Sequence, residues 1–164
     1  MFGLTSLGIF HTIISLLAVI AGAILLIRDR KISWDTSIGK FYVVATIIVC
    51  VTGFGIFQHG GFGKPHALGI LTLIVFCIAF ATSKKSTLFG RYTPYVETIS
   101  YSTTFFFHLV PAITETGTRL PLSSPLASSP DDPNIQAAIG ICFVLFVIGV
   151  ALQVRSLRGK LQRA

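Results

Sequence analysis

The segment that decides the fold is residues 3–27, GLTSLGIFHTIISLLAVIAGAILLI, which contains no Asp, Glu, Lys or Arg. A helix rises about 1.5 Å per residue, so a run of this length reaches across the roughly 30 Å hydrocarbon core of a bilayer. The first basic residue, Arg28, follows the run. A cleavable signal peptide has basic residues before a shorter apolar core, so we expect a helix that is retained in the membrane.

The composition is also typical of a membrane protein. Of the 164 residues, 52% are hydrophobic and 12% are charged, and the mean hydropathy is +0.80. Soluble domains carry about 25% charged residues, so much of the usual solvating surface is absent. The net charge of +7 comes from Lys and Arg clustered between apolar runs. This distribution is typical of topology signals and argues against nucleic-acid binding.

Further apolar runs of near-spanning length follow the first one. They cover residues 41–57, 65–82, 99–116 and 135–154. The run 99–116 is the most polar, because it contains several hydroxyl residues, His108 and Pro111. We predict an all-α membrane protein, with residues 1–164 forming a single domain that is a bundle of five transmembrane helices.

The distribution of Lys and Arg predicts the orientation of these helices. No basic residue precedes the first run, and the loops after the second and fourth runs carry only Lys64 and Arg119. The other two loops and the tail are basic; they carry Arg28, Arg30, Lys31, Lys40, Lys84, Lys85, Arg91, Arg155, Arg158, Lys160 and Arg163. Because basic residues mark the cytoplasmic side of short loops, the N-terminus is predicted outside and the C-terminus in the cytoplasm. The chain must then cross twice after Arg91.

Two connectors are predicted on the outer side. Residues 120–134, LPLSSPLASSPDDPN, are rich in Pro and Ser and indicate a flexible loop. Residues 59–66, HGGFGKPH, indicate a tight turn in which Pro65 opens the third helix.

Small residues on the first run predict a helix-packing face. Gly8, His11, Ser15, Ala18 and Gly22 follow one another at spacings of three and four, which places them on one side of a helix. Membrane helices pack closely through small residues, so Gly8, Ser15 and Gly22 are expected to face a neighbouring helix. His11 should then point into the bundle.

A polar face is predicted on the fourth run. Ser100, Thr104, His108, Pro111 and Glu115 lie at similar spacings, so His108 is also expected to face inward. His11 and His108 each lie eight residues from the outer end of their run, roughly 12 Å deep.

These histidines are the candidate cofactor ligands. Two imidazoles at equal depth on separate helices suit axial ligation of haem b or of another metal centre, and we predict that His11 and His108 approach each other. A hydrogen bond between helices is the alternative use of an intramembrane histidine. His66, at the outer start of the third run, is a further candidate, whereas His59 and Glu115 have no assigned role.

The sequence carries no recognisable catalytic signature. It lacks GxSxG, HExxH and a P-loop. Cys50, Cys77 and Cys142 lie inside apolar runs without the spacing of disulfides or a zinc site.

Three segments carry a resemblance to a known family: FHTIISLLAVIAGAILL at 10–26, IGKFYVV at 38–44 and GGFGKPHALGILTL at 60–73. With them the chain resembles the DUF2306 family of uncharacterised small prokaryotic membrane proteins. The resemblance implies a multi-pass helical protein of a bacterial inner (plasma) membrane, with no established activity. His11 and His66 match family histidines. Members typically carry a His-Arg pair where this sequence has Trp34 and Asp35.

Three functions remain open from the sequence. The first is a small accessory or scaffold subunit of a larger membrane complex, respiratory or photosynthetic, because short loops and small-residue faces suit packing against other subunits or a second copy. The second is a redox protein with histidine-ligated haem b or metal. The third is a transporter or a lipid or quinone handler, although the chain shows no inverted repeats.

Overall fold

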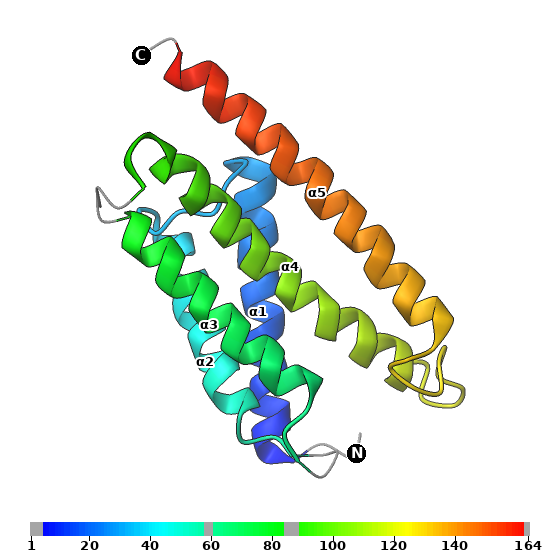
Figure 1. Ribbon diagram of the computed structural model, residues 1–164. Helices are drawn as coiled ribbons and strands as arrows, with labels where there is room; N and C mark the ends of the chain where they lie inside the picture. Colours follow the sequence, from blue (N-terminus) through cyan, green and yellow to red (C-terminus); the bar gives the residue numbers. More distant parts are fainter. Residues whose placement is uncertain (1–4, 58–60, 84–88, 163–164) are drawn as a thin grey trace. The chain divides into compact units, whose positions relative to one another are not determined.

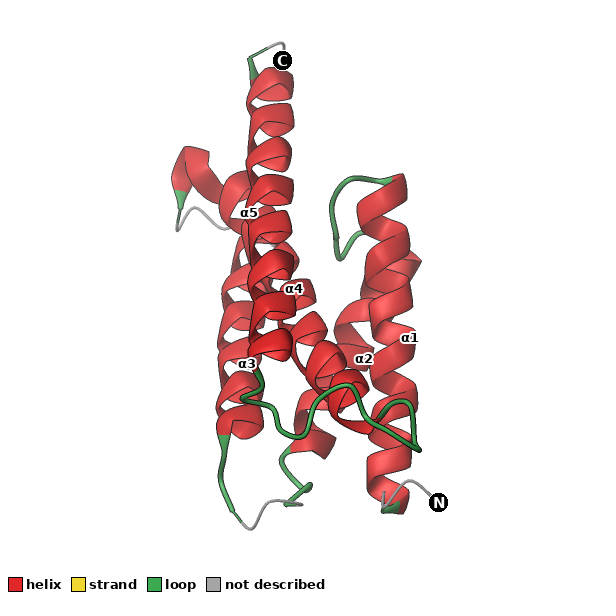
Figure 2. Cartoon of the chain, turned by 90° about the vertical axis from the view of Figure 1, so that its right-hand side faces the viewer, coloured by secondary structure: helices red, strands yellow, loops and turns green. Residues whose placement is uncertain are grey.

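The elements that the structure describes are all helical (Figure 2). The computed structural model describes residues 5–57, 61–83 and 89–162, and no strand occurs among them. Its helices are α1 (Ser6–Arg28), α2 (Ser37–Gly53), α3 (Lys64–Ser83), α4 (Thr93–Arg119) and α5 (Pro133–Leu161), with a 3-10 turn at Gly90–Tyr92. The predicted all-α class is therefore confirmed.

Hydroxyl and carboxylate caps fix where three of the helices begin. Thr5 accepts from the Gly8 N–H at 3.1 Å at the start of α1. Thr36 accepts from the Gly39 N–H at 3.0 Å, so α2 begins before the apolar run that was predicted at 41–57. It also ends earlier, at Gly53. Asp132 caps α5 by accepting from Asn134 N–H at 2.8 Å. Such caps satisfy N–H groups that the first helical turn leaves without a backbone acceptor.

Three of the helices, α1, α3 and α5, are long and apolar enough to cross a membrane. The apolar helix α2 is shorter, with 17 residues. The polar helix α4 has 27 residues, more than the predicted run 99–116. The five-helix bundle and its orientation stay predictions.

The chain divides into two compact units, residues 1–104 and 105–164, so that α4 contributes to both. In the first unit α2 contacts both α1 and α3 (Figure 1). The small-residue face of α1 lies inside this unit: Gly8, Ala18 and Gly22 are buried, and Leu25 extends the buried face by one turn. Small side chains on this face allow α1 and α2 to approach closely.

The second unit joins the end of α4 to α5. The Phe106 ring stacks on Phe146 with a centroid distance of 5.1 Å. A Cβ on Gly117 would lie 2.2 Å from Ile135 Cδ1, so the two helices approach closely at this end.

The predicted flexible loop between α4 and α5 contains hydrogen-bonded turns. Ala127 N–H donates to the Gly117 carbonyl at 3.0 Å, and Leu126 N–H donates to the Leu120 carbonyl at 3.1 Å. Ala127 is buried. These backbone hydrogen bonds satisfy polar groups of the Pro- and Ser-rich segment within the chain itself.

Candidate functional site

His11 links α1 to α2. Its Nδ1 lies 3.0 Å from Thr52 Oγ1, and the Thr52 hydroxyl donates to the Ile48 carbonyl at 2.8 Å. Because that hydroxyl hydrogen is already used, His11 Nδ1–H is the donor and Thr52 Oγ1 the acceptor. The imidazole also lies against backbone, since a Cβ on Gly53 would be 3.3 Å from His11 Cε1. This geometry is that of a polar link between helices.

His66 is a buried histidine in the first turn of α3. It is 7% exposed, and its ring stacks on Phe57 and Phe62 with centroid distances of 5.0 and 5.4 Å. Its Nδ1 accepts from the Gly63 N–H at 3.2 Å. In the neutral ring, the proton is therefore on Nε2, which is buried without a hydrogen-bond partner.

The tautomer decides what His66 can do chemically. A metal bound at Nε2 would require the proton on Nδ1, where it would face the Gly63 N–H. In this arrangement His66 is a hydrogen-bond donor and is poorly suited to ligate haem. A buried unsatisfied N–H is costly, so an acceptor on another molecule would stabilise it.

His108 belongs to the second unit and is 5% exposed. On the predicted α4 face, Ser100 and Thr104 are buried as well, whereas Glu115 is exposed and forms an ion pair with Arg119. His11 and His108 lie in different units. Their approach to each other stays a prediction, and His59 lies outside the described residues.

A buried polar contact joins α2 to the first part of α4. Tyr42 and Thr104 are both fully buried, and their side-chain oxygens are 2.9 Å apart. Thr104 donates to the Tyr101 carbonyl at 2.8 Å, so the Tyr42 hydroxyl donates to Thr104. The Phe76 ring packs edge-on against Tyr42 and Tyr101, with centroid distances of 6.2 and 6.1 Å.

Tyr42 was not predicted from the sequence as an interior polar residue. Tyrosine occurs both in membrane interfaces and in protein interiors, so its residue type alone does not reveal its depth. The partner Thr104 was placed on an inward face by its spacing, but spacing does not identify the helix that it faces.

Glu97, at the start of α4, is a second residue that the sequence analysis missed. Burial raises the pKa of its carboxyl, Lys31 opposes this shift, and Asp35 adds to it. Lys31 and Asp35 belong to the loop between α1 and α2, in which Trp34 packs edge-on against Phe80 of α3 at 5.8 Å. The sequence contained a signal for Glu97, because a carboxyl group is unusual so near a membrane span and Glu97 lies two residues before the run 99–116.

The described residues contain no cluster of side chains arranged to bind a metal ion. No group of three or more His, Cys, Asp or Glu residues there could hold a metal ion. Cys50, Cys77 and Cys142 are free thiols. The polar side chains described above mainly connect helices. Among the described residues, only His66 is buried with a side-chain donor that has no hydrogen-bond partner.

The chain was compared with protein-family models, curated protein sequences and solved structures, and nothing matched. The resemblance to the DUF2306 family therefore stays a prediction.

Proposed function

We propose that the chain is a multi-pass protein of a bacterial inner membrane, with five crossings, an outer N-terminus and a cytoplasmic C-terminus. Support comes from three apolar helices of spanning length and from the alternation of basic and non-basic loops. Helix α2 would cover about 26 Å and α4 about 40 Å at the normal helical rise.

Four hydroxyl groups of α4 are compatible with a crossing because they are satisfied within the helix. Four threonines donate to backbone carbonyls three or four residues earlier, at 2.8–2.9 Å: Thr103, Thr104, Thr114 and Thr118. In hydrocarbon, where water is absent, polar groups must find their partners in the protein.

We further propose that the protein is a small accessory or scaffold subunit of a larger membrane complex. The observation that carries this proposal is an exposed face of α5 formed by three small residues and two valines, which we call the small-residue face of α5. Ala137, Gly140, Val144, Val147 and Ala151 alternate at spacings of three and four, and all are exposed. Such a face is what closely packed membrane helices present to each other.

Gly140 strengthens this interpretation. A glycine inside a helix costs about 1 kcal/mol relative to alanine, yet no atom lies within 4 Å of where its Cβ would be. Packing within the chain therefore does not explain the glycine, whereas close approach of a helix from another subunit would.

A photo-cross-linking residue in place of Val144 tests the proposal in native membranes. The control is the same residue in place of Leu145, which is also exposed but lies about 100° further around the helix. We expect one discrete protein adduct from position 144, carrying either another subunit or a second copy, and none from position 145. Gly140→Leu should abolish the adduct. Equal lipid labelling at both positions, without a protein adduct, would contradict the scaffold proposal.

The absorption spectrum of the purified protein separates the scaffold from the redox alternative. The scaffold proposal predicts no Soret band. A band that shifts on reduction, and that is lost in both His11→Phe and His108→Phe variants, would establish haem b at these two histidines instead.

A further inference from the structure

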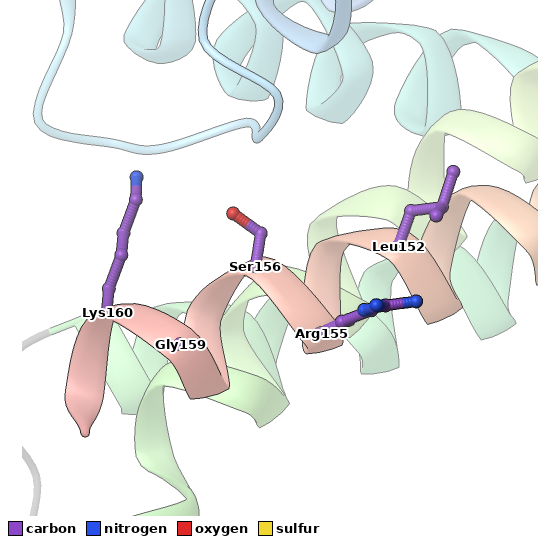
Figure 3. Close-up of a pocket in the computed structure, with 5 residues that line it drawn as sticks. All are labelled: Leu152, Arg155, Ser156, Gly159 and Lys160. Carbon is purple, nitrogen blue, oxygen red and sulfur yellow. The ribbon is translucent and has the colours of Figure 1, made fainter. Parts of the chain in front are cut away.

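The C-terminal end of α5 carries a groove that the proposed scaffold role does not use. The groove is shallow and open, and it is lined by residues of α5 alone: Leu152, Arg155, Ser156, Gly159 and Lys160. These positions recur at spacings of three and four, so they share one side of the helix. Figure 3 shows Leu152, Ser156 and Lys160 projecting to the same side, with the Arg155 side chain extending along the helix.

The length of α5 places this groove at the membrane surface. With 29 residues, the helix is roughly 43 Å long, whereas the hydrocarbon core is about 30 Å thick. If the apolar residues 135–154 fill the core, the residues from Arg155 onward emerge from it. Arg155 to Lys160 then cover about 7 Å along the axis, close to the thickness of one headgroup layer. Leu152 stays at acyl-chain depth.

The side chains match an anionic phosphate headgroup in chemistry as well as in depth. A guanidinium, an ammonium and a hydroxyl all donate hydrogen bonds to phosphate oxygens, and the first two also supply charge. No atom lies within 4 Å of the position that a Gly159 Cβ would take, so the backbone there is open to a headgroup.

We propose that this groove binds the phosphate of an anionic phospholipid, with Arg155, Ser156 and Lys160 at the headgroup and Leu152 against an acyl chain. The proposal requires that α5 crosses the membrane and is independent of the scaffold role. Arg158 provides the matched comparison, because it carries the same charge on the same exposed helix end but does not line the groove.

The test uses full-length protein in uncharged detergent micelles at 0.15 M salt and titrates it with fluorescent phosphatidylglycerol. Fluorescent phosphatidylcholine and inorganic phosphate are the comparison ligands. We expect phosphatidylglycerol to bind best and inorganic phosphate to compete poorly, because phosphate lacks the acyl chain. Arg155→Gln and Lys160→Gln should each weaken phosphatidylglycerol binding about tenfold, as expected for the loss of one charge-assisted contact. Arg158→Gln should weaken it less than about twofold, because Arg158 does not line the groove and an exposed charge that makes no direct contact contributes little.

Gly159→Leu distinguishes binding in the groove from nonspecific attraction to the basic end of α5. It retains every charge and improves helix propensity, but its side chain would occupy the open space over residue 159, so phosphatidylglycerol binding should fall as it does in Lys160→Gln. An equal loss in Arg158→Gln, or unchanged binding in Gly159→Leu, would overturn the proposal in favour of a nonspecific basic end. Competition by inorganic phosphate at the affinity of the lipid would overturn it in favour of a free-anion site.

Discussion

At the residue scale, buried and half-buried polar side chains connect helices that apolar contacts alone would hold less specifically. Tyr42 donates to Thr104, and His11 donates to Thr52. Both hydrogen bonds join residues far apart in the sequence, so they define which helices are neighbours and in which register. A transmembrane interior has no water to replace a lost partner, which makes such contacts sensitive to substitution.

Tyr42→Phe tests the first of these contacts. The variant keeps the ring and its packing on Phe76 but removes the hydroxyl, so we expect a loss of about 1 kcal/mol in the free energy of unfolding. Reversible unfolding in detergent, followed by circular dichroism, measures the change. Tyr92→Phe is the control, because Tyr92 is 55% exposed, and it should have little effect. Equal stabilities of the Tyr42→Phe variant and the parent would show that the contact contributes nothing.

Glu97→Gln should change the dependence of stability on pH. A carboxyl whose pKa is raised on folding binds its proton more tightly in the folded state, so stability falls as the pH rises from the ordinary value of 4.5 through the raised one. Glutamine cannot ionise. The variant should therefore match the parent near pH 4 and be more stable at pH 7.

Asp131→Asn removes one negative charge from the other unit and serves as the control for Glu97→Gln. It should not reproduce the gain at pH 7. A Glu97→Gln variant that is less stable than the parent at pH 7 would instead show that the ionised carboxylate is stabilised by Lys31.

At the element scale, the sequence predicted where the helices are better than where they begin and end. The pattern of apolar runs identified α3 to within one residue at each end and α1 to within three residues. It misplaced α2 by several residues at each end, because the cap formed by Thr36 lies outside the apolar run. It also shortened α4, whose first turns contain Glu97 and are not apolar.

Part of the candidate site could be predicted, and part could not. Spacing placed His108 and Thr104 on an inner face of α4, and both are buried. Spacing cannot give the hydrogen-bond partners of His11 and His66, because Thr52 and the Gly63 N–H reach them through tertiary packing and a local turn. The tautomer of His66, which decides its chemistry, depends on that turn.

The start of α2 requires a residue without a side chain at position 39, which is Gly39. A Cβ at this position would lie 1.8 Å from the Ser33 carbonyl oxygen, which is backbone and cannot rotate away. Gly39→Ala should therefore destabilise the protein by about 1–3 kcal/mol, the usual cost of overpacking. Gly140→Ala, at an open helical site, should instead stabilise it by up to about 1 kcal/mol. Thermal unfolding of the two variants in the same detergent compares them directly, and a Gly39→Ala variant as stable as Gly140→Ala would disprove the close approach.

At the scale of the whole molecule, the proposed topology has five membrane crossings. Three helices qualify by length and composition, whereas α4 qualifies only through the distribution of charge around it and through four hydroxyl groups that donate within the helix. The scaffold proposal and the lipid groove both require that α5 crosses the membrane, and the exposed small-residue face must then lie within the bilayer. Because α4 is the most polar of the proposed membrane helices, its crossing is the one to test.

Reporter fusions at defined positions test the topology most directly. Fusions after Lys40, Arg91 and Arg163 are predicted to report the cytoplasm, and fusions near Gly61 and Ser124 are predicted to report the outside. Ser124 is decisive, because it lies between α4 and α5. An outer location for Ser124 together with a cytoplasmic location for Arg91 would establish that α4 crosses. A cytoplasmic signal at Ser124 would remove that crossing and contradict the five-helix account.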